Sequence, residues 1–283
     1  MGTRLGTAGV ALPIIVYLLQ SPEWVVVLVA GAAVAGVLEL LWLTNGVFAG
    51  WHVVAATASG VVPVVVWAHG CGSGWTLGCV LGAAGAGMVC GMGVVDPREG
   101  GKGVLSVVAA GVGVLYIALP LGIAGLFPTL DPAYSGLGVV VLFTAWNVDN
   151  GGLVGGNISW PWTKHRLAPV LSPKKTWEGV VCGAILASLS PSILEALADA
   201  LGITWAYPVH ARFPWDLKLV LAATVTVTMV AGDLLESFLK RGVQVKDSSG
   251  LFPGHGGVLD KIDGLVFALP AAYALLYAHY SST

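Results

Sequence analysis

Charged side chains are scarce in this chain. Only 10% of the 283 residues are Asp, Glu, Lys or Arg, whereas 56% are hydrophobic. A soluble domain carries about 25% charged residues. The first 90 residues contain just three charges, Arg4, Glu23 and Glu39. This composition excludes an ordinary soluble domain and indicates a membrane protein whose chain crosses the bilayer several times.

Cysteine is also infrequent, and its spacing argues against a zinc site and against a disulfide framework. The four cysteines are Cys71, Cys79, Cys90 and Cys182, and none of them forms a pair with zinc-ligand spacing. The first three lie in or beside apolar runs. We therefore expect buried free thiols.

Long apolar runs dominate the rest of the chain. A transmembrane helix needs about 20 apolar residues, and nine stretches approach or reach that length. They cover residues 5–19, 24–43, 51–67, 75–95, 104–127, 137–154, 179–201, 217–239 and 262–280. We predict an all-α integral membrane protein, a polytopic bundle of about nine transmembrane helices. Glu39 lies inside the second stretch, where we expect a buried structural carboxyl group.

The distribution of positive charge predicts the orientation in the membrane. With nine helices, every Lys and Arg except Arg212 and Lys218 falls on the same side of the bilayer. Cytoplasmic loops carry the excess of positive charge in membrane proteins. We therefore place the N-terminus and both polar stretches described below in the cytoplasm, and the C-terminus outside.

The C-terminal polar stretch, residues 232–264, holds much of the charge of the chain. Asp233, Glu236, Ser237 and Lys240 are spaced by three and four residues, which places them on one face of a helix end. A loop with five glycines follows, and glycine lets backbone N–H groups come close to an oxyanion. Carboxylates from two helix ends, with cations between them, predict a site for Mg²⁺ and phosphates. The alternative is a solvated loop whose charges only set topology, but topology does not require acids at helix ends.

The central polar stretch, residues 147–179, is the second candidate. Asp149 closes an apolar helix, and the sequence Ser-Pro-Lys-Lys-Thr-Trp-Glu-Gly begins at Ser172. We predict that Ser172 caps a helix whose first turn contains Lys174 and Lys175. Cations at a helix N-terminus oppose the helix dipole, so their position favours a bound anion there.

Both stretches resemble the phosphatidate cytidylyltransferases, also called CDP-diacylglycerol synthases. The residues that carry the resemblance in the C-terminal polar stretch are Ser237, Lys240-Arg241, Lys246-Asp247, Pro253-Gly254-His255-Gly256-Gly257 and Asp260-Lys261-Ile262-Asp263. In the central polar stretch they are Leu-Ala-Pro, two further residues, and Ser-Pro-Lys-Lys-Thr-Trp-Glu-Gly. Lys261 stands where the family usually has Arg. Asp149 is kept, but its neighbours depart from the usual Asp-Thr-Gly-Ala-Tyr.

The resemblance implies the reaction of CTP with phosphatidate to give CDP-diacylglycerol and pyrophosphate. It implies Mg²⁺ as cofactor, leaves open a second, monovalent cation, and suggests a homodimer in contact with membrane lipid, with no nucleic acid as partner. The active site would face the cytoplasm from a bacterial inner membrane. Residues 1–135 would be the scaffold, with a possible dimer contact and a lipid-facing surface, and residues 136–283 would carry the catalytic loops.

The resemblance also implies roles for individual residues. Metal ligands would be Asp233 and Asp260, with Asp263 and Asp149 as further candidates, and Glu236 and Ser237 would orient the metal shell. The other catalytic residues would be Lys246, Asp247 and His255. The residues that bind substrate would be Ser172, Lys174, Lys175, Thr176, Glu178, Ser237, Lys240, Arg241, Gly254, Gly256, Gly257 and Lys261. Two roles for His255 stay open: proton donor to the leaving pyrophosphate, or structural hydrogen-bonding partner.

Two other functions are compatible with parts of this pattern. One is another enzyme that uses CTP on a lipid, such as a CDP-archaeol synthase or a polyprenol kinase. The other is a transporter, whose polar residues should lie at mid-span rather than at helix ends on one side of the membrane.

Overall fold

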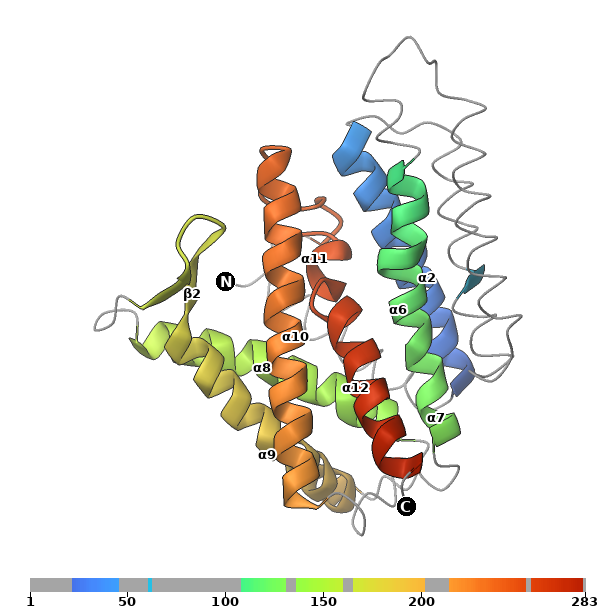
Figure 1. Ribbon diagram of the computed structural model, residues 1–283, viewed down its shortest axis with the longest axis vertical. Coiled ribbons are helices and arrows are strands. Elements are labelled where there is room, and N and C mark those ends of the chain that lie inside the picture. The colour runs from blue at the N-terminus through green and yellow to red at the C-terminus, as the bar shows by residue number, and fades with distance from the viewer. Residues whose placement is uncertain are drawn as a thin grey trace. The chain divides into compact units, whose positions relative to one another are not determined.

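The computed structural model describes residues 22–45, 61–62, 108–130, 136–159, 165–201, 214–252 and 256–281. These residues are mostly helical (Figure 1). Within them, six helices are long and apolar enough to cross a membrane: Val26–Thr44, Val108–Leu126, Leu137–Ile158, Trp177–Leu197, Trp215–Gly242 and Leu259–Ser281. Each coincides with a predicted apolar stretch. The described residues therefore form an all-α membrane protein, and the count of nine transmembrane helices stays a prediction.

The other three predicted spans, residues 5–19, 51–67 and 75–95, lie outside the described residues, apart from a helical pair at 61–62. The chain forms two compact units. The first comprises the described residues up to Leu126 together with Lys240–Ile262, and the second comprises Phe127–Leu239 and Asp263–Thr283. The expected division at residue 135 stays a prediction.

The first unit is built around helix α2, Pro22–Asn45. It packs against a helical segment formed by η2 (Val114–Ala118), α6 (Leu119–Gly122) and η3 (Ile123–Leu126), and against the short helix α11, Leu259–Ile262. The π-helical turn η2 precedes Pro120, and the Leu119 N–H donates to the Val114 carbonyl. Since proline has no N–H to continue the regular ladder, a local change in hydrogen bonding is expected there.

The second unit contains α7 (Phe127–Leu130), α8 (Leu137–Ser159), α9 (Trp177–Leu201), most of α10 (Trp215–Gly242) and α12 (Leu265–Ser281). Helix α8 packs along α9, and α12 contacts α7 and α8. The strands β1 (Arg166–Ala168) and β2 (Ser172–Thr176) form a hairpin that leads directly into α9 (Figure 1). Phe127 and Tyr273 meet edge to face at a centroid separation of 5.6 Å.

Glycines bring the backbones of α8 and α9 together. A Cβ atom at Gly151 would lie 2.6 Å from the Cα of Gly183, and one at Gly155 would lie 2.9 Å from the Glu178 carbonyl oxygen. Small residues permit this close approach in membrane helices, where van der Waals packing drives association. The contact fixes the hairpin and the start of α9 beside the part of α8 that carries Asp149.

This contact gives a stability prediction. Gly151→Ala should lower the free energy of unfolding by about 1–3 kcal/mol, because the helices must separate to admit the methyl group. Unfolding of the detergent-solubilised protein in an SDS titration measures this change. Gly152→Ala is the matched control, since a Cβ atom there meets nothing within 4 Å. Equal destabilisation by both variants would contradict the close packing of α8 on α9.

The predicted helix start at Ser172 is wrong. Residues Ser172–Thr176 form β2, which pairs antiparallel with β1, and α9 begins at Trp177. Thr176 is the residue that caps the helix, because its Oγ1 accepts the Gly179 N–H at 3.1 Å. Lys174 and Lys175 therefore lie on a strand before the helix rather than in its first turn. Pairing between β1 and β2 satisfies backbone N–H and C=O groups of both strands. A helix that began at Ser172 would leave the backbone of β1 without these partners.

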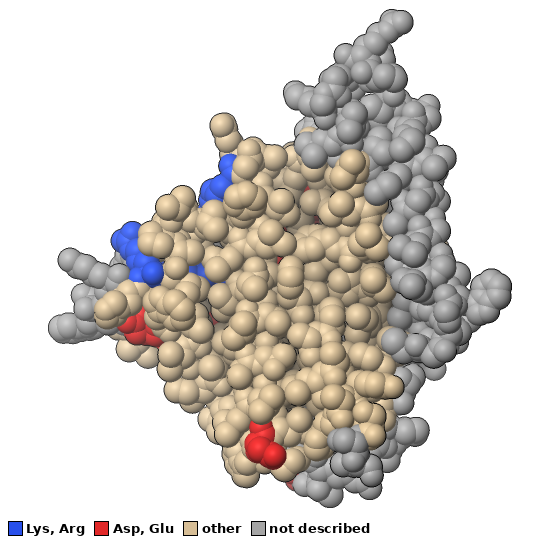
Figure 2. Space-filling model, viewed as in Figure 1, with Lys and Arg blue, Asp and Glu red and all other residues tan. Residues whose placement is uncertain are grey.

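The long helices expose apolar side chains. Leu153 and Ile158 on α8, Val181 on α9 and Val227 on α10 are between 58% and 71% exposed. In the face shown in Figure 2, charged atoms are few among the described residues, and most of the surface is uncharged. Helices of this length with apolar outer surfaces suit a lipid environment rather than water.

Candidate functional site

A pocket of about 250 Å³ opens in the second unit, where α8, β2, the start of α9 and α10 meet. Its polar lining consists of Asp149 from α8, Lys174, Lys175 and Thr176 from β2, and Asp233 from α10. The remaining wall is apolar, with Val148, Val180, Met229 and Val230 among its residues. The expected convergence of the central and C-terminal polar stretches is confirmed for these residues.

Lys175 and Asp233 form an ion pair across this pocket. The Lys175 Nζ contacts the Asp233 Oδ2, and the two side chains are 24% and 34% exposed. The Ser237 Oγ, one helical turn further along α10, lies 3.3 Å from the Asp233 Oδ1 and donates to it. The carboxylate of Asp233 is therefore oriented by a cation from β2 and by a hydroxyl from its own helix.

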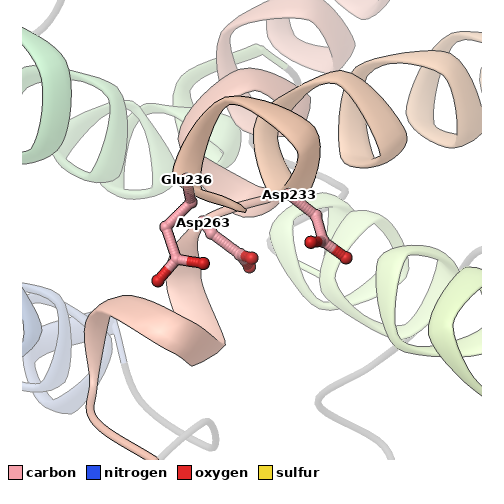
Figure 3. Close-up of side chains that lie close together, drawn as sticks. All are labelled: Asp233, Glu236 and Asp263. Atoms are coloured by element: carbon pink, nitrogen blue, oxygen red, sulfur yellow. The ribbon is translucent and has the colours of Figure 1, made fainter. Parts of the chain in front are cut away.

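The carboxylate of Asp233 lies close to two others, those of Glu236 and Asp263 (Figure 3). Asp233 and Glu236 lie on α10, and Asp263 lies in the turn between α11 and α12. Each offers one oxygen, and these oxygens lie within 4.8 Å of one another. Glu236 is only 1% exposed. Like charges this close repel, so a cation bound among them would stabilise the group.

Two glycines position Asp263 against α10. A Cβ atom at Gly232 would lie 2.3 Å from the Asp263 carbonyl oxygen, and one at Gly264 would lie 2.6 Å from the Met229 sulfur. The Asp263 side chain also accepts the Gly264 N–H at 2.8 Å. The absence of side chains at Gly232 and Gly264 is what allows the turn to approach the helix.

The three carboxylates of Asp233, Glu236 and Asp263 fit a hard divalent cation. Mg²⁺ binds carboxylate oxygens at about 2.0–2.1 Å, so two ligands of one ion can lie up to about 4.2 Å apart. Small side-chain movements from the observed 4.8 Å limit would satisfy this distance. We expected Asp233 and Asp260 as the main ligands, Asp263 as a further candidate and Glu236 as an orienting residue, whereas the group that the structure brings together contains Glu236 and not Asp260. The spacing of three residues between Asp233 and Glu236 was the signal for a direct role of Glu236.

A second polar cluster lies in the first unit, centred on Asp260. The Lys240 Nζ lies 2.5 Å from the Asp260 Oδ1, and both side chains are about nine-tenths buried. The Asp260 Oδ2 accepts the Ser248 N–H at 2.9 Å and the Gly257 N–H at 2.7 Å, and it lies 2.9 Å from the Ser248 hydroxyl. The predicted metal role of Asp260 stays a prediction, and in this arrangement its carboxylate organises the loop.

Among the described glycines of the loop, Gly256 has the expected conformational role. Gly256 has a φ of +81°, a value that residues with a Cβ atom rarely adopt. A Cβ atom there would also lie 2.3 Å from the Asp260 Oδ2. The loop does bring a backbone N–H to an oxyanion, as its composition predicted, but in this structure the oxyanion is the carboxylate of Asp260.

Glu39 is joined to the same loop from α2. It is 7% exposed and accepts hydrogen bonds from the hydroxyls of Ser248 and Ser249 and from the backbone N–H groups of Val258 and Leu259. The expectation of a buried structural carboxyl group is confirmed. Its partners lie more than 200 residues away in the sequence, and no local pattern indicated them.

The remaining predicted site residues are more exposed or lie elsewhere. Glu178 accepts from the His165 Nδ1 at 2.9 Å, and Arg241 donates to the Val245 carbonyl at 2.9 Å. Ser172 on β2 is half-buried. Lys246, Asp247 and Lys261 are exposed, whereas Gly254 and His255 lie outside the described residues. The roles assigned to these residues stay predictions.

Comparison with known proteins connects this arrangement to a family. Over 147 residues the chain is 40% identical to the phosphatidate cytidylyltransferase of Pseudomonas aeruginosa, covering 52% of this chain and 49% of that protein. The corresponding protein of Rickettsia bellii is 29% identical over 163 residues, covering 57% of this chain and 66% of the relative. That of Staphylococcus saprophyticus is 34% identical over 167 residues, covering 53% and 58%.

These matches span about half to two thirds of the length of the curated relatives. The model of the cytidylyltransferase family matches residues 2–279, which is nearly the whole chain. The match therefore includes both polar stretches and the helices that hold them. The chain belongs to the cytidylyltransferase family.

Proposed function

We propose that this protein is a phosphatidate cytidylyltransferase, an enzyme that converts CTP and phosphatidate to CDP-diacylglycerol and pyrophosphate. The observation that carries the proposal is the pocket in which Lys174 and Lys175 face Asp233, with Glu236 and Asp263 beside it. Phosphate-binding cations and metal-binding carboxylates in a helical membrane unit are what the transfer of a nucleotidyl group to a lipid phosphate requires. The names of the matched relatives support the same substrates.

In this reaction an oxygen of the lipid phosphate forms a bond to the α-phosphorus of CTP. The bond from that phosphorus to the bridging oxygen breaks, and the electron pair leaves with pyrophosphate. A phosphate monoester has a second pKa near 6, so the lipid phosphate is mostly dianionic at pH 7 and needs no general base. The main barrier is repulsion between anions, about 4 kcal/mol for two unit charges 4 Å apart at an effective dielectric of 20.

The side chains of the pocket address this repulsion. Lys174 and Lys175 would neutralise phosphate charge, and the Lys175 ion pair with Asp233 keeps that cation at the edge of the carboxylate group. Mg²⁺ held by Asp233, Glu236 and Asp263 would neutralise charge that develops on the phosphates. Asp149 and Asp260 are further candidate ligands, and a monovalent cation is part of the same proposal.

We also infer the setting of the enzyme. The asymmetry of Lys and Arg along the chain supports a bundle of nine helices whose polar stretches face the cytoplasm. A bacterial inner membrane is part of the same proposal. The lipid phosphate lies at headgroup level, where the ends of membrane helices place their loops. A homodimer belongs to the same proposal.

The direct test is a turnover assay with the full chain purified in detergent. CTP and phosphatidate should give CDP-diacylglycerol and pyrophosphate in equal amounts, and removal of divalent cations with EDTA should abolish the reaction until Mg²⁺ is restored. A panel with an archaeal ether lipid and a polyprenol separates the related lipid enzymes. Turnover of one of those substrates but not of phosphatidate would reject the assignment, as would full activity in EDTA.

A further inference from the structure

Glu39 is the starting point for an inference beyond the reaction itself. It is one of three charged residues among the first 90, and it lies within a helix long and apolar enough to cross a membrane. A buried charge in such a helix is costly unless it is fully hydrogen-bonded. A carboxylate retained there must hold something in place or bind something.

The hydrogen bonds that the Glu39 side chain accepts come from two short segments, residues 248–249 and residues 258–259. Its Oε1 accepts the Ser249 hydroxyl at 2.7 Å and the Val258 N–H at 3.0 Å. Its Oε2 accepts the Ser248 hydroxyl at 2.8 Å and the Leu259 N–H at 2.7 Å. The carboxylate thus ties the beginning of the loop, residues 248 and 249, to its end, residues 258 and 259.

The same loop carries the Asp260 cluster. The Ser248 Oγ lies 2.8 Å from the Glu39 Oε2 and 2.9 Å from the Asp260 Oδ2, so its single O–H is shared between the two carboxylates. Gly257 lies against both carboxylates, and the absence of a side chain there allows this approach. Its N–H donates to Asp260, and a Cβ atom there would lie 2.3 and 2.5 Å from the two oxygens of Glu39. Displacement of Glu39 would therefore release Asp260 and its partner Lys240.

We propose that Glu39 is a positioning residue for the cytidylyltransferase reaction, which holds residues 248–249 against residues 258–259 so that Asp260 and Lys240 keep one geometry. The inference rests on the proposed function for its kinetic part only. Lys240 is among the residues we expect to bind the phosphates of CTP. Loss of the clamp should therefore weaken the binding of CTP, and a smaller folded fraction would not produce that effect.

Glu39→Gln is the sharpest variant because it keeps the length of the side chain. The new NH₂ group must face either the Val258 N–H or the Leu259 N–H, and a backbone N–H cannot reverse its polarity as a serine hydroxyl can. At least one donor then faces another donor. Hydrogen exchange of the peptide 248–262 should become about tenfold faster, as expected for the loss of one hydrogen bond.

The kinetic expectation is an increase of about tenfold in the KM for CTP, the lower range of effects seen when a residue that orients a site is changed. Ser249→Ala removes a single hydroxyl from the Glu39 contact and should raise the KM less. The double variant with Glu39→Gln and Ser249→Ala should raise the KM for CTP by less than the product of the two single increases, because both substitutions act through the same contact. Asp216→Asn, an exposed carboxylate in the first turn of α10, is the control and should change neither measurement.

Three results would overturn the proposal: unchanged exchange of residues 248–262 in Glu39→Gln, an unchanged KM for CTP despite faster exchange, or strictly multiplicative effects in the double variant. If Glu39→Gln does not fold, Ser249→Ala and Glu39→Asp supply the same comparison. Exchange is measured without substrate, so it tests the clamp even if the parent protein makes no CDP-diacylglycerol. That last outcome would instead reject the proposed function.

Discussion

Replacing Asp233 by asparagine is expected to lower kcat/KM for CDP-diacylglycerol formation by about 1,000-fold, with the protein still folded and inserted. Asparagine keeps the shape of the side chain and can still accept from Ser237, but it removes the negative charge that contacts Lys175. It also removes one of three carboxylates whose oxygens lie within 4.8 Å. Charge stabilisation by a bound metal is worth several kcal/mol, and each 1.4 kcal/mol is a factor of ten in rate.

The control for this variant lies on the same helix. Asp216→Asn changes an exposed carboxylate in the first turn of α10 and should leave kcat/KM unchanged. Retention of the folded state is checked by size-exclusion chromatography of both variants. Near-normal product formation by Asp233→Asn would remove the basis for a metal at this position.

The dependence of rate on Mg²⁺ concentration then separates two ligand sets. The sequence pattern favours Asp233 with Asp260, whereas the geometry groups Asp233 with Glu236 and Asp263. If the geometric group is the metal site, Glu236→Gln and Asp263→Asn should require more Mg²⁺ for half-maximal rate. Asp260→Asn should then lower activity because Ser248 and Gly257 lose the carboxylate that holds them, with little change in the Mg²⁺ requirement.

The helical spans were predictable because membrane insertion demands a long apolar run, which is a property of local sequence. The six described spans follow from this demand alone. The hairpin before α9 was not predictable in the same way. Ser172 followed by proline and Thr176 followed by Trp-Glu are both acceptable helix starts, and only the pairing of β2 with Arg166–Ala168 decides between them.

The candidate site was predictable where the chemistry is carried by helix spacing. Asp233, Glu236, Ser237 and Lys240 lie on one helix as expected, and the glycine loop has the positive φ that its composition allowed. The part that escaped prediction depends on contacts between distant segments. Glu39 meets residues 248–249 and 258–259 across the chain, and its isolated position in an apolar helix carries no information about those partners.

Lys175→Ala is expected to lower kcat/KM by about 100-fold, the scale of effect seen when one group that stabilises developing charge is removed. Lys175 lines the pocket and contacts Asp233, so its loss removes a cation available to the phosphates and increases repulsion among Asp233, Glu236 and Asp263. Both effects act on CTP turnover. Steady-state kinetics with CTP as the varied substrate measure the change.

Two neighbouring substitutions make the role of Lys175 specific. Lys175→Arg keeps the charge but replaces a compact ammonium group by a planar guanidinium, so it should recover part of the loss but not all of it. Lys174→Ala removes an exposed cation from the same strand and pocket, and should cost only about 10-fold because water already screens that charge. A larger loss of kcat/KM for Lys174→Ala than for Lys175→Ala would mean that the phosphates bind at the exposed Lys174 rather than at Lys175 beside Asp233. The ion pair with Asp233 would then hold the strand in place rather than take part in the reaction.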